Sequence, residues 1–312
     1  DTVSYDTTFN EPNVGVTVNL TTGLATDAGG STDTLTSIEN IVGTDFNDTI
    51  TGSSDANSLS GQDGVDTFIG SAGNDILRGS SNTEDFSTNY SVVDYSSGTL
   101  GLTVTGSSSS ATATSGVFGT DTLFNIDAVI GGSGADNFSA TSIEFEGLGG
   151  NDTFTNVQRV RYDNSTSGVT VSLATGIAFD GFGGTDSLAG DGLDISGSAF
   201  NDIITGSGTN TTIENLRGGA GNDVINGGTQ GAAGLDQASY FEDPNGVIVN
   251  LSTGVGFDGY GDVDTLSNIE RLSGSQFSDN LTGDANNNEL QGNFGADFID
   301  GGAGSDTATF LF

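Results

Sequence analysis

The chain has 312 residues, and its 5 basic and 42 acidic residues give a formal net charge of −37. It contains no His, Cys, Met or Trp, and every basic residue is Arg. This composition excludes Ser-His-Asp and Cys-His triads, ordinary zinc sites and lysine Schiff bases. The charge argues against nucleic-acid binding, and no apolar run reaches the roughly 18 residues of a membrane span.

Four imperfect long repeats divide the chain into residues 1–91, 92–158, 159–237 and 238–312. Each repeat opens near a tyrosine, at Tyr5, Tyr95, Tyr162 and Tyr240. An alternating, β-branched segment follows, which predicts a strand, over residues 15–20, 100–104, 168–173 and 246–251. Aromatic residues at a repeated position typically fill the core. We therefore expect these tyrosines inside the fold, with stacking on sugars as the alternative.

Pairs of aspartates around a glycine-containing turn come after the strand segments. The pairs are Asp27 with Asp33, Asp180 with Asp186, and Asp258 with Asp264. The second repeat keeps only one of the two carboxylates, Asp121. Acidic pairs of this kind can chelate a hard cation, but Asp and Gly are also the common residues of solvated turns. Both interpretations stay open.

The second half of each repeat has a period of nine. Glycines stand at positions 43, 52, 61, 70 and 79 in the first repeat and at 274, 283, 292 and 301 in the fourth. The sixth residue of each nine is Asp or Asn and the eighth is apolar, while the second and third repeats are less regular. High net charge with few apolar residues is typical of intrinsic disorder. The strict period instead predicts a repetitive fold that needs bound cations, since so much like charge repels itself in a compact state.

The best nines resemble the calcium-binding nonapeptides of RTX, or haemolysin-type, proteins. They are GSAGNDILR (70–78), GGAGNDVIN (218–226) and GGAGSDTAT (301–309). The resemblance implies multiple bound Ca²⁺ ions and an all-β fold, a right-handed parallel β-roll or β-helix, which we expect to form one continuous solenoid over residues 1–312. It also implies a secreted bacterial protein, located outside the cell or at its surface and exported by a type I system. Phe46, Phe200 and Phe277 replace the fourth-position Gly, so we expect those loops to bind weakly or to serve as caps.

Calcium takes six to eight oxygens from carboxylates and carbonyls, and glycines allow the tight loops that expose carbonyls. Two nines would make one coil, so loops on the same side would stack at about 4.8 Å. This spacing predicts Asp48 over Asp66, Asn57 over Asp75, Asp279 over Asp297, and Asn288 over Asp306. The predicted metal ligands in the nonapeptide region are Asp48, Asn57, Asp66, Asp75, Asp136, Asp152, Asp202, Asp223, Asp236, Asp279, Asn288, Asp297 and Asp306. The aspartate pairs Asp27/Asp33, Asp180/Asp186 and Asp258/Asp264 are the second predicted set.

These features favour a calcium-dependent extracellular structural protein, a building block of a surface layer, a filament or an adhesin stalk. We do not expect an enzyme, because every good carboxylate pair lies in a predicted calcium loop. The alternatives are a calcium-binding carrier or secretion module of a larger secreted enzyme, and a carbohydrate-binding adhesin. The expected partners are calcium ions and either further copies joined head to tail or a longer parent chain, since DTATF (306–310) repeats the opening DTVSY (1–5).

Overall fold

The computed structural model describes residues 1–5, 14–27, 29–80, 89–190, 192–207, 212–228 and 236–310. All regular structure in these ranges is β-strand, and most strand pairs are parallel, so the predicted all-β parallel roll is confirmed. Within the described ranges, no helix is long and apolar enough to cross a membrane. The chain divides into two compact units, residues 1–157 and 158–312, and this boundary lies next to the predicted junction of the second and third repeats. One continuous solenoid stays a prediction.

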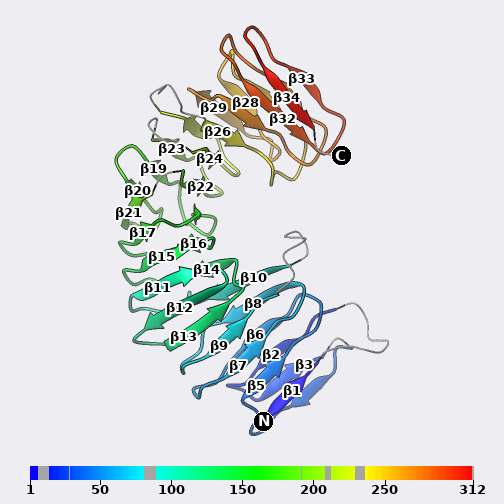
Figure 1. Ribbon diagram of the computed structural model, residues 1–312, viewed down its shortest axis with the longest axis vertical. Helices are drawn as coiled ribbons and strands as arrows, with labels where there is room; N and C mark the ends of the chain where they lie inside the picture. Colours follow the sequence, from blue (N-terminus) through cyan, green and yellow to red (C-terminus); the bar gives the residue numbers. More distant parts are fainter. Residues whose placement is uncertain are drawn as a thin grey trace. The chain divides into compact units, whose positions relative to one another are not determined.

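The N-terminal unit consists of two sheets, and apart from β2–β4 and β11–β13 successive strands of the chain belong alternately to one and the other (Figure 1). The first sheet has the spatial order β1 (Thr2–Ser4), β5 (Asn40–Val42), β7 (Ser58–Ser60), β9 (Ile76–Arg78), β13 (Gly119–Phe124), β12 (Ser110–Ser115), β11 (Leu102–Ser107), β15 (Asn137–Thr141), β17 (Thr153–Thr155). The second has the order β4 (Thr32–Thr34), β3 (Leu24–Thr26), β2 (Thr17–Asn19), β6 (Thr49–Thr51), β8 (Val65–Ile69), β10 (Tyr90–Asp94), β14 (Ala128–Ile130), β16 (Glu144–Glu146).

The C-terminal unit repeats this arrangement. One sheet has the order β21 (Thr185–Ala189), β20 (Ile177–Phe179), β19 (Thr170–Ser172), β23 (Ile203–Thr205), β25 (Val224–Asn226), β29 (Val263–Ser267), β28 (Val255–Phe257), β27 (Ile248–Asn250), β31 (Asn280–Thr282), β33 (Phe298–Asp300). The other has the order β18 (Arg159–Arg161), β22 (Asp194–Ser196), β24 (Glu214–Arg217), β26 (Asp236–Ser239), β30 (Arg271–Ser273), β32 (Glu289–Asn293), β34 (Thr307–Phe310).

The period of nine sets the strand register. In one sheet Ile41 lies beside Leu59, which lies beside Leu77, and in the other sheet Ile50 lies beside Phe68. Partners in these pairs are two nines apart, so each pair of nines forms one coil with one strand in each sheet. The predicted stacking of loops on the same side follows directly from this register.

The spacers do not follow the parallel pattern. Each strand segment after a repeat's tyrosine starts a three-stranded antiparallel meander: β2–β3–β4, β11–β12–β13, β19–β20–β21 and β27–β28–β29. In three of them the first turn contains a Thr-Gly pair whose glycine, Gly23, Gly176 or Gly254, has φ of 67–68°. A β-carbon on Gly176 would also come within 2.6 Å of the carbonyl oxygen of Leu188. Glycine is therefore required there for both backbone angle and space.

The core is a thin apolar layer between the two sheets of each unit. The eighth-position residues of the nines up to Leu290 are almost completely buried, whereas Ile299 is half-buried and Ala308 is exposed in the last two nines. Several of the largest buried rings lie in the second repeat. There Phe138 stacks on Phe145 at 4.6 Å and on Phe154 at 5.2 Å between ring centroids. Tyr95, Tyr162 and Tyr240 are also buried, which confirms their expected core position, whereas Tyr5 is only partly buried.

The phenylalanine stack provides a stability test. We expect Phe138→Ala to lower the free energy of unfolding of the calcium-loaded protein by about 3–5 kcal/mol, because the buried ring leaves a cavity. Leu100→Ala removes a side chain of the same unit that is 55% exposed and should cost less than about 0.5 kcal/mol. Denaturant unfolding followed by circular dichroism compares the two. Equal losses would contradict the two-sheet core.

Candidate calcium sites

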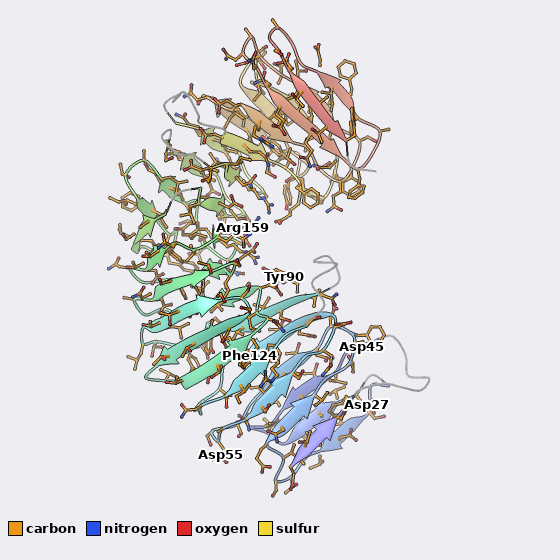
Figure 2. All side chains as sticks on the ribbon, viewed as in Figure 1. Asp27, Asp45, Asp55, Tyr90, Phe124 and Arg159 are labelled. Atoms are coloured by element: carbon orange, nitrogen blue, oxygen red, sulfur yellow. The ribbon has the colours of Figure 1, made fainter. Side chains whose placement is uncertain are left out.

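The glycine-rich loops lie along two opposite edges of each unit. In the N-terminal unit Asp45, in the loop before β6, and Asp55, in the loop before β7, lie at opposite edges (Figure 2). Within one edge the loops are in close contact. A β-carbon on Gly64 would lie 2.6 Å from the carbonyl carbon of Phe46, and one on Gly73 would lie 2.6 Å from the carbonyl oxygen of Asp55. Consecutive loops on one edge thus stack backbone on backbone, as predicted.

The sixth-position carboxylates connect these loops into a ladder. The backbone N–H of Asp48 donates to Oδ1 of Asp66 at 3.1 Å, and the N–H of Asn57 donates to Oδ1 of Asp75 at 2.8 Å. The same bond joins Asp279 to Asp297, Asn288 to Asp306, Asp136 to Asp152, and Asp202 to Asp223. All four stacked pairs expected from the spacing are therefore in contact. Asp121 and Asp264 continue the ladder by accepting from the N–H groups of Asp75 and Asp223.

The first glycine of each nine makes room for this carboxylate. A β-carbon on Gly43 would lie 2.0 Å from Oδ2 of Asp48, and a β-carbon on Gly61 would lie 2.0 Å from Oδ2 of Asp66. The fourth-position glycines have a different requirement, because Gly64 and Gly221 have φ of 115° and 121°, which other residues rarely adopt.

The loops that carry Phe at the fourth position satisfy their own carboxylates. Asp48 accepts from Val16 N–H and from the Thr44 hydroxyl on Oδ1, and from Thr44 N–H on Oδ2. Asp202 and Asp279 have the same set of donors, with Ser198 and Ser275 in place of Thr44. These loops close the ladder with protein donors alone, which supports their interpretation as caps.

Two of the three loops that follow them leave a carboxylate oxygen without a donor. Oδ2 of Asp66 and Oδ2 of Asp223 are buried and have no hydrogen-bond partner, and the two side chains are at most 1% exposed. Burial, followed by repulsion from Asp48 and Asp63, raises the pKa of Asp66 from 3.8 to about 8. Burial and the neighbouring aspartates Asp264, Asp202 and Asp258 raise the pKa of Asp223 from 3.8 to about 8.

A bound cation fits these orphaned oxygens. A buried carboxylate without donors is costly when ionised, and a divalent cation would remove that cost. Among the described residues, no group of three or more acidic side chains converges closely enough to hold a metal by itself. Ca²⁺ at these loops would therefore take most of its oxygens from the glycine-rich backbone, with one carboxylate from each loop, which suits its preference for mixed oxygen ligands.

The remaining predicted nonapeptide ligands differ in their surroundings. Asp75 accepts from Ser71, and burial raises its pKa. Asn57 and Asn288 accept a loop N–H on Oδ1 and donate Nδ2 to the carbonyls of Glu39 and Glu270. Asp297 and Asp306 are half-buried. Asp236 lies at the start of β26 rather than in a loop.

Two of the three spacer pairs also contain an orphaned oxygen. Asp180 and Asp258 each accept three backbone N–H groups on Oδ1, from residues 182–184 and 260–262. Oδ2 of both is buried without a partner. Their companions Asp186 and Asp264 are buried and accept from the hydroxyls of Tyr162 and Tyr240.

The third pair lies in a different environment. Asp27 accepts from the N–H of Ser31 and is only partly buried, and Asp33 is exposed. The exposed pair Asp27/Asp33 therefore fits the solvated-turn interpretation best. The buried pairs Asp180/Asp186 and Asp258/Asp264 fit the chelation interpretation best.

Three carboxylates with related roles were not predicted. Asp243 is buried beside Gly259, and burial together with repulsion from Asp258 and Asp264 raises its pKa to about 7. Glu214 accepts from Ser207 N–H and approaches Gly206 as a sixth-position Asp would. Asp127 accepts from Ser91 N–H on the second sheet. Glu214 stands outside the period of nine because of the longer spacing in the third repeat, so only the loop geometry reveals it.

Removing one ladder carboxylate should weaken calcium binding. We expect Asp66→Asn to raise the calcium concentration at half-folding by roughly tenfold, which corresponds to about 1.4 kcal/mol, because the amide cannot supply the anionic oxygen. Asp55→Asn makes the same change of charge in an exposed loop residue and should leave the midpoint unchanged. Calcium titration followed by circular dichroism measures both midpoints, and equal shifts would contradict the site.

The raised pKa values predict a dependence on pH. In the calcium-free fold Asp66 and Asp223 hold protons up to about pH 8, whereas the unfolded chain releases them near pH 4. Their contribution to the stability of the calcium-free fold is thus complete below about pH 4 and is lost as the pH rises through about 8. Calcium must displace those protons, so its affinity should rise with pH. Calorimetry at pH 6 in buffers of different ionisation enthalpy measures the proton release, on calcium-free protein whose circular dichroism spectrum shows that it is folded at that pH. Calcium binding to this folded form without proton release would contradict the assignment.

Comparison with known families agrees with this geometry. The model of the RTX calcium-binding nonapeptide repeat matches residues 42–79, 209–230 and 273–308, in four copies. No curated protein matches the chain. The matched segments include the loops of Asp48, Asp66, Asp223 and Asp279, where the carboxylate ladder is most regular. Both units of this chain therefore contain segments that match the RTX calcium-binding nonapeptide repeat.

Proposed function

We propose that the chain is a calcium-dependent structural protein that folds outside the cell. The observation that carries the proposal is the set of buried sixth-position carboxylates, above all Asp66 and Asp223, each with one oxygen that has no donor. With a net charge of −37, the fold needs counter-charge inside its loops rather than only around its surface. RTX repeats are typical of secreted bacterial proteins, and millimolar calcium is an extracellular condition.

The ordering of the loops follows from the same chemistry. Calcium between stacked loops would link one coil to the next, so binding free energy becomes folding free energy. In the calcium-poor cytosol the chain would stay extended, which suits export by a type I system. We propose Asp180/Asp186 and Asp258/Asp264 as further ligands, since each pair contains an orphaned oxygen.

The finer role that we propose is a building block of a surface layer, filament or adhesin stalk. Support comes from one sheet face of the C-terminal unit, where Ile248 lies beside Phe257 and Phe257 lies beside Val263. The three side chains are 54%, 51% and 39% exposed. Contiguous exposed apolar side chains are typical of contact surfaces. No catalytic role is proposed, because the buried carboxylates of the described loops are occupied by the ladder.

Folding should be coupled to calcium. We expect chelated protein at pH 7.5 to give a random-coil circular dichroism spectrum, and calcium to restore the β spectrum cooperatively at about 10⁻⁴–10⁻³ M, the range of extracellular modules. Magnesium at the same concentration should fail, because it demands octahedral geometry and dehydrates reluctantly. A full β spectrum in excess chelator would falsify the proposal.

A further inference from the structure

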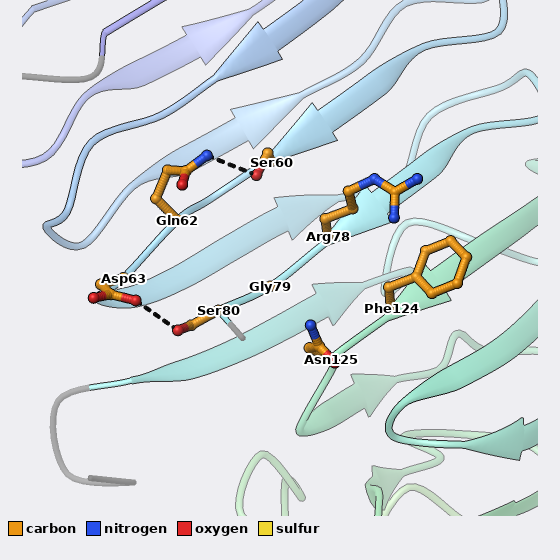
Figure 3. A pocket seen from close by; sticks show the side chains of 8 residues that line it. All are labelled: Ser60, Gln62, Asp63, Arg78, Gly79, Ser80, Phe124 and Asn125. Carbon is orange, nitrogen blue, oxygen red and sulfur yellow. Dashed lines mark hydrogen bonds between the residues drawn. The ribbon is translucent and has the colours of Figure 1, made fainter. Parts of the chain in front are cut away.

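A pocket of about 220 Å³ opens on the N-terminal unit between β7, β9 and β13, and the glycine-rich loop before β8 forms part of its wall. Its walls include Gln62, Asp63, Arg78, Phe124 and Asn125 (Figure 3). Gln62 donates Nε2 to Ser60 at 3.1 Å, which leaves its Oε1 as an acceptor toward the pocket, and Asp63 accepts from Ser80 at 2.7 Å. Pockets that enclose drug-sized ligands start near about 300 Å³, so this one suits a smaller ligand.

Arg78 supplies the positive charge of the pocket. It is the only basic residue in positions 1–157, yet among the described residues it makes no ion pair and donates no side-chain hydrogen bond. Its guanidinium carbon instead lies 4.4 Å from the centroid of the Phe124 ring. Stacking of this kind holds the guanidinium plane in place and leaves its N–H fork free.

Comparison with the C-terminal unit shows that the Arg78–Phe124 pair is not required by the fold. Phe124 lies beside Arg78 in the β9–β13 register, and the same register in β25 and β29 places Ser267 beside Asn226. The following turn residues, Asn125 and Asn268, have the same φ of 53°. In the C-terminal unit Asn268 simply donates to Asn226 at 2.8 Å. The cation and the ring are thus added to a turn that forms without them.

The chemistry of the pocket identifies a class of ligand. A fixed guanidinium fork recognises a planar carboxylate with two parallel hydrogen bonds. Asp63, Gln62 and Asn125 offer oxygen acceptors and amide donors that match hydroxyl groups, and the charge of Asp63 opposes a second anionic group on the ligand. We propose that this pocket binds the carboxylate of an acidic sugar, a single uronic acid unit, either free or at the end of a glycan. Gln62 and Asp63 belong to the loop that carries Asp66, so calcium at that loop would order one wall of the pocket.

The test uses the calcium-loaded full chain and D-galacturonic acid. We expect saturable shifts of the side-chain amide NMR signals of Gln62 and Asn125, with an affinity in the millimolar range that is usual for so small a ligand. D-galactose, which lacks the carboxylate, and acetate, which lacks the hydroxyl groups, should each bind at least tenfold more weakly. Equal binding of galactose would overturn the role of Arg78, and equal binding of acetate would overturn the assignment to a sugar.

Variants complete the test. Arg78→Asn introduces the residue found at the equivalent position 226 and should weaken galacturonate binding at least tenfold. Phe124→Ser introduces the residue found at the equivalent position 267 and should weaken it several-fold. Arg78→Lys keeps the charge but loses the fork, so most of the affinity should also disappear. Arg161→Asn removes one positive charge from an ion pair with Asp163 in the other unit and should leave binding unchanged. Retention of binding by Arg78→Asn, with an unchanged β spectrum, would refute the proposal. An oligomer of galacturonic acid serves as the probe for the end of a glycan. If it binds no better than the monomer, the ligand is the free acid.

Discussion

The bond from a loop N–H to the carboxylate of the next loop organises this molecule. It needs an Asp at the sixth position, a glycine at the first so that the carboxylate can fold back, and strands paired in register two nines apart. Each requirement appears in the sequence as a fixed position within the nine. Each of these hydrogen bonds joins one coil to the next. The ladder therefore stabilises the chain through contacts between neighbouring coils rather than through a deep core, as in other solenoids.

The same ladder also creates an electrostatic problem. Each Asp uses Oδ1 as an acceptor for the coil before it, and in the cap loops Oδ2 accepts from the backbone N–H of the loop's own second residue. In the loops of Asp66 and Asp223 the corresponding N–H does not reach the carboxylate, and Oδ2 is left buried without a donor. The two kinds of loop thus differ at two positions: the cap loops have Thr44 or Ser198 at the second and Phe46 or Phe200 at the fourth, whereas the loops of Asp66 and Asp223 have Gln62 or Gly219 at the second and glycine at the fourth.

Much of this arrangement could be predicted from the sequence. The period of nine predicted the strand pairing of Ile50 with Phe68 and the contact of Asp48 with Asp66, because a fixed spacing leaves one register. The antiparallel meanders could not be predicted, since a short alternating segment has the same pattern in either strand direction. Asp243 and Glu214 were missed for a related reason: burial depends on which loop lies above a residue, and irregular spacing hides that. The Arg78–Phe124 contact joins residues 46 positions apart across a meander, and no local signal marks it.

The meanders also make the coils unequal under mechanical load. Where only nonapeptides are present, neighbouring strands are 18 residues apart, so losing one coil under tension would release a contour of about 60 Å. Two meanders, β11–β12–β13 and β27–β28–β29, lie between successive coils. The chain is longer there and contains antiparallel hairpins, whose hydrogen bonds break one after another under tension. Under tension such a chain would extend in short steps where its nonapeptide coils open and in longer steps where its spacers open, so the positions of the meanders determine the sequence of step lengths.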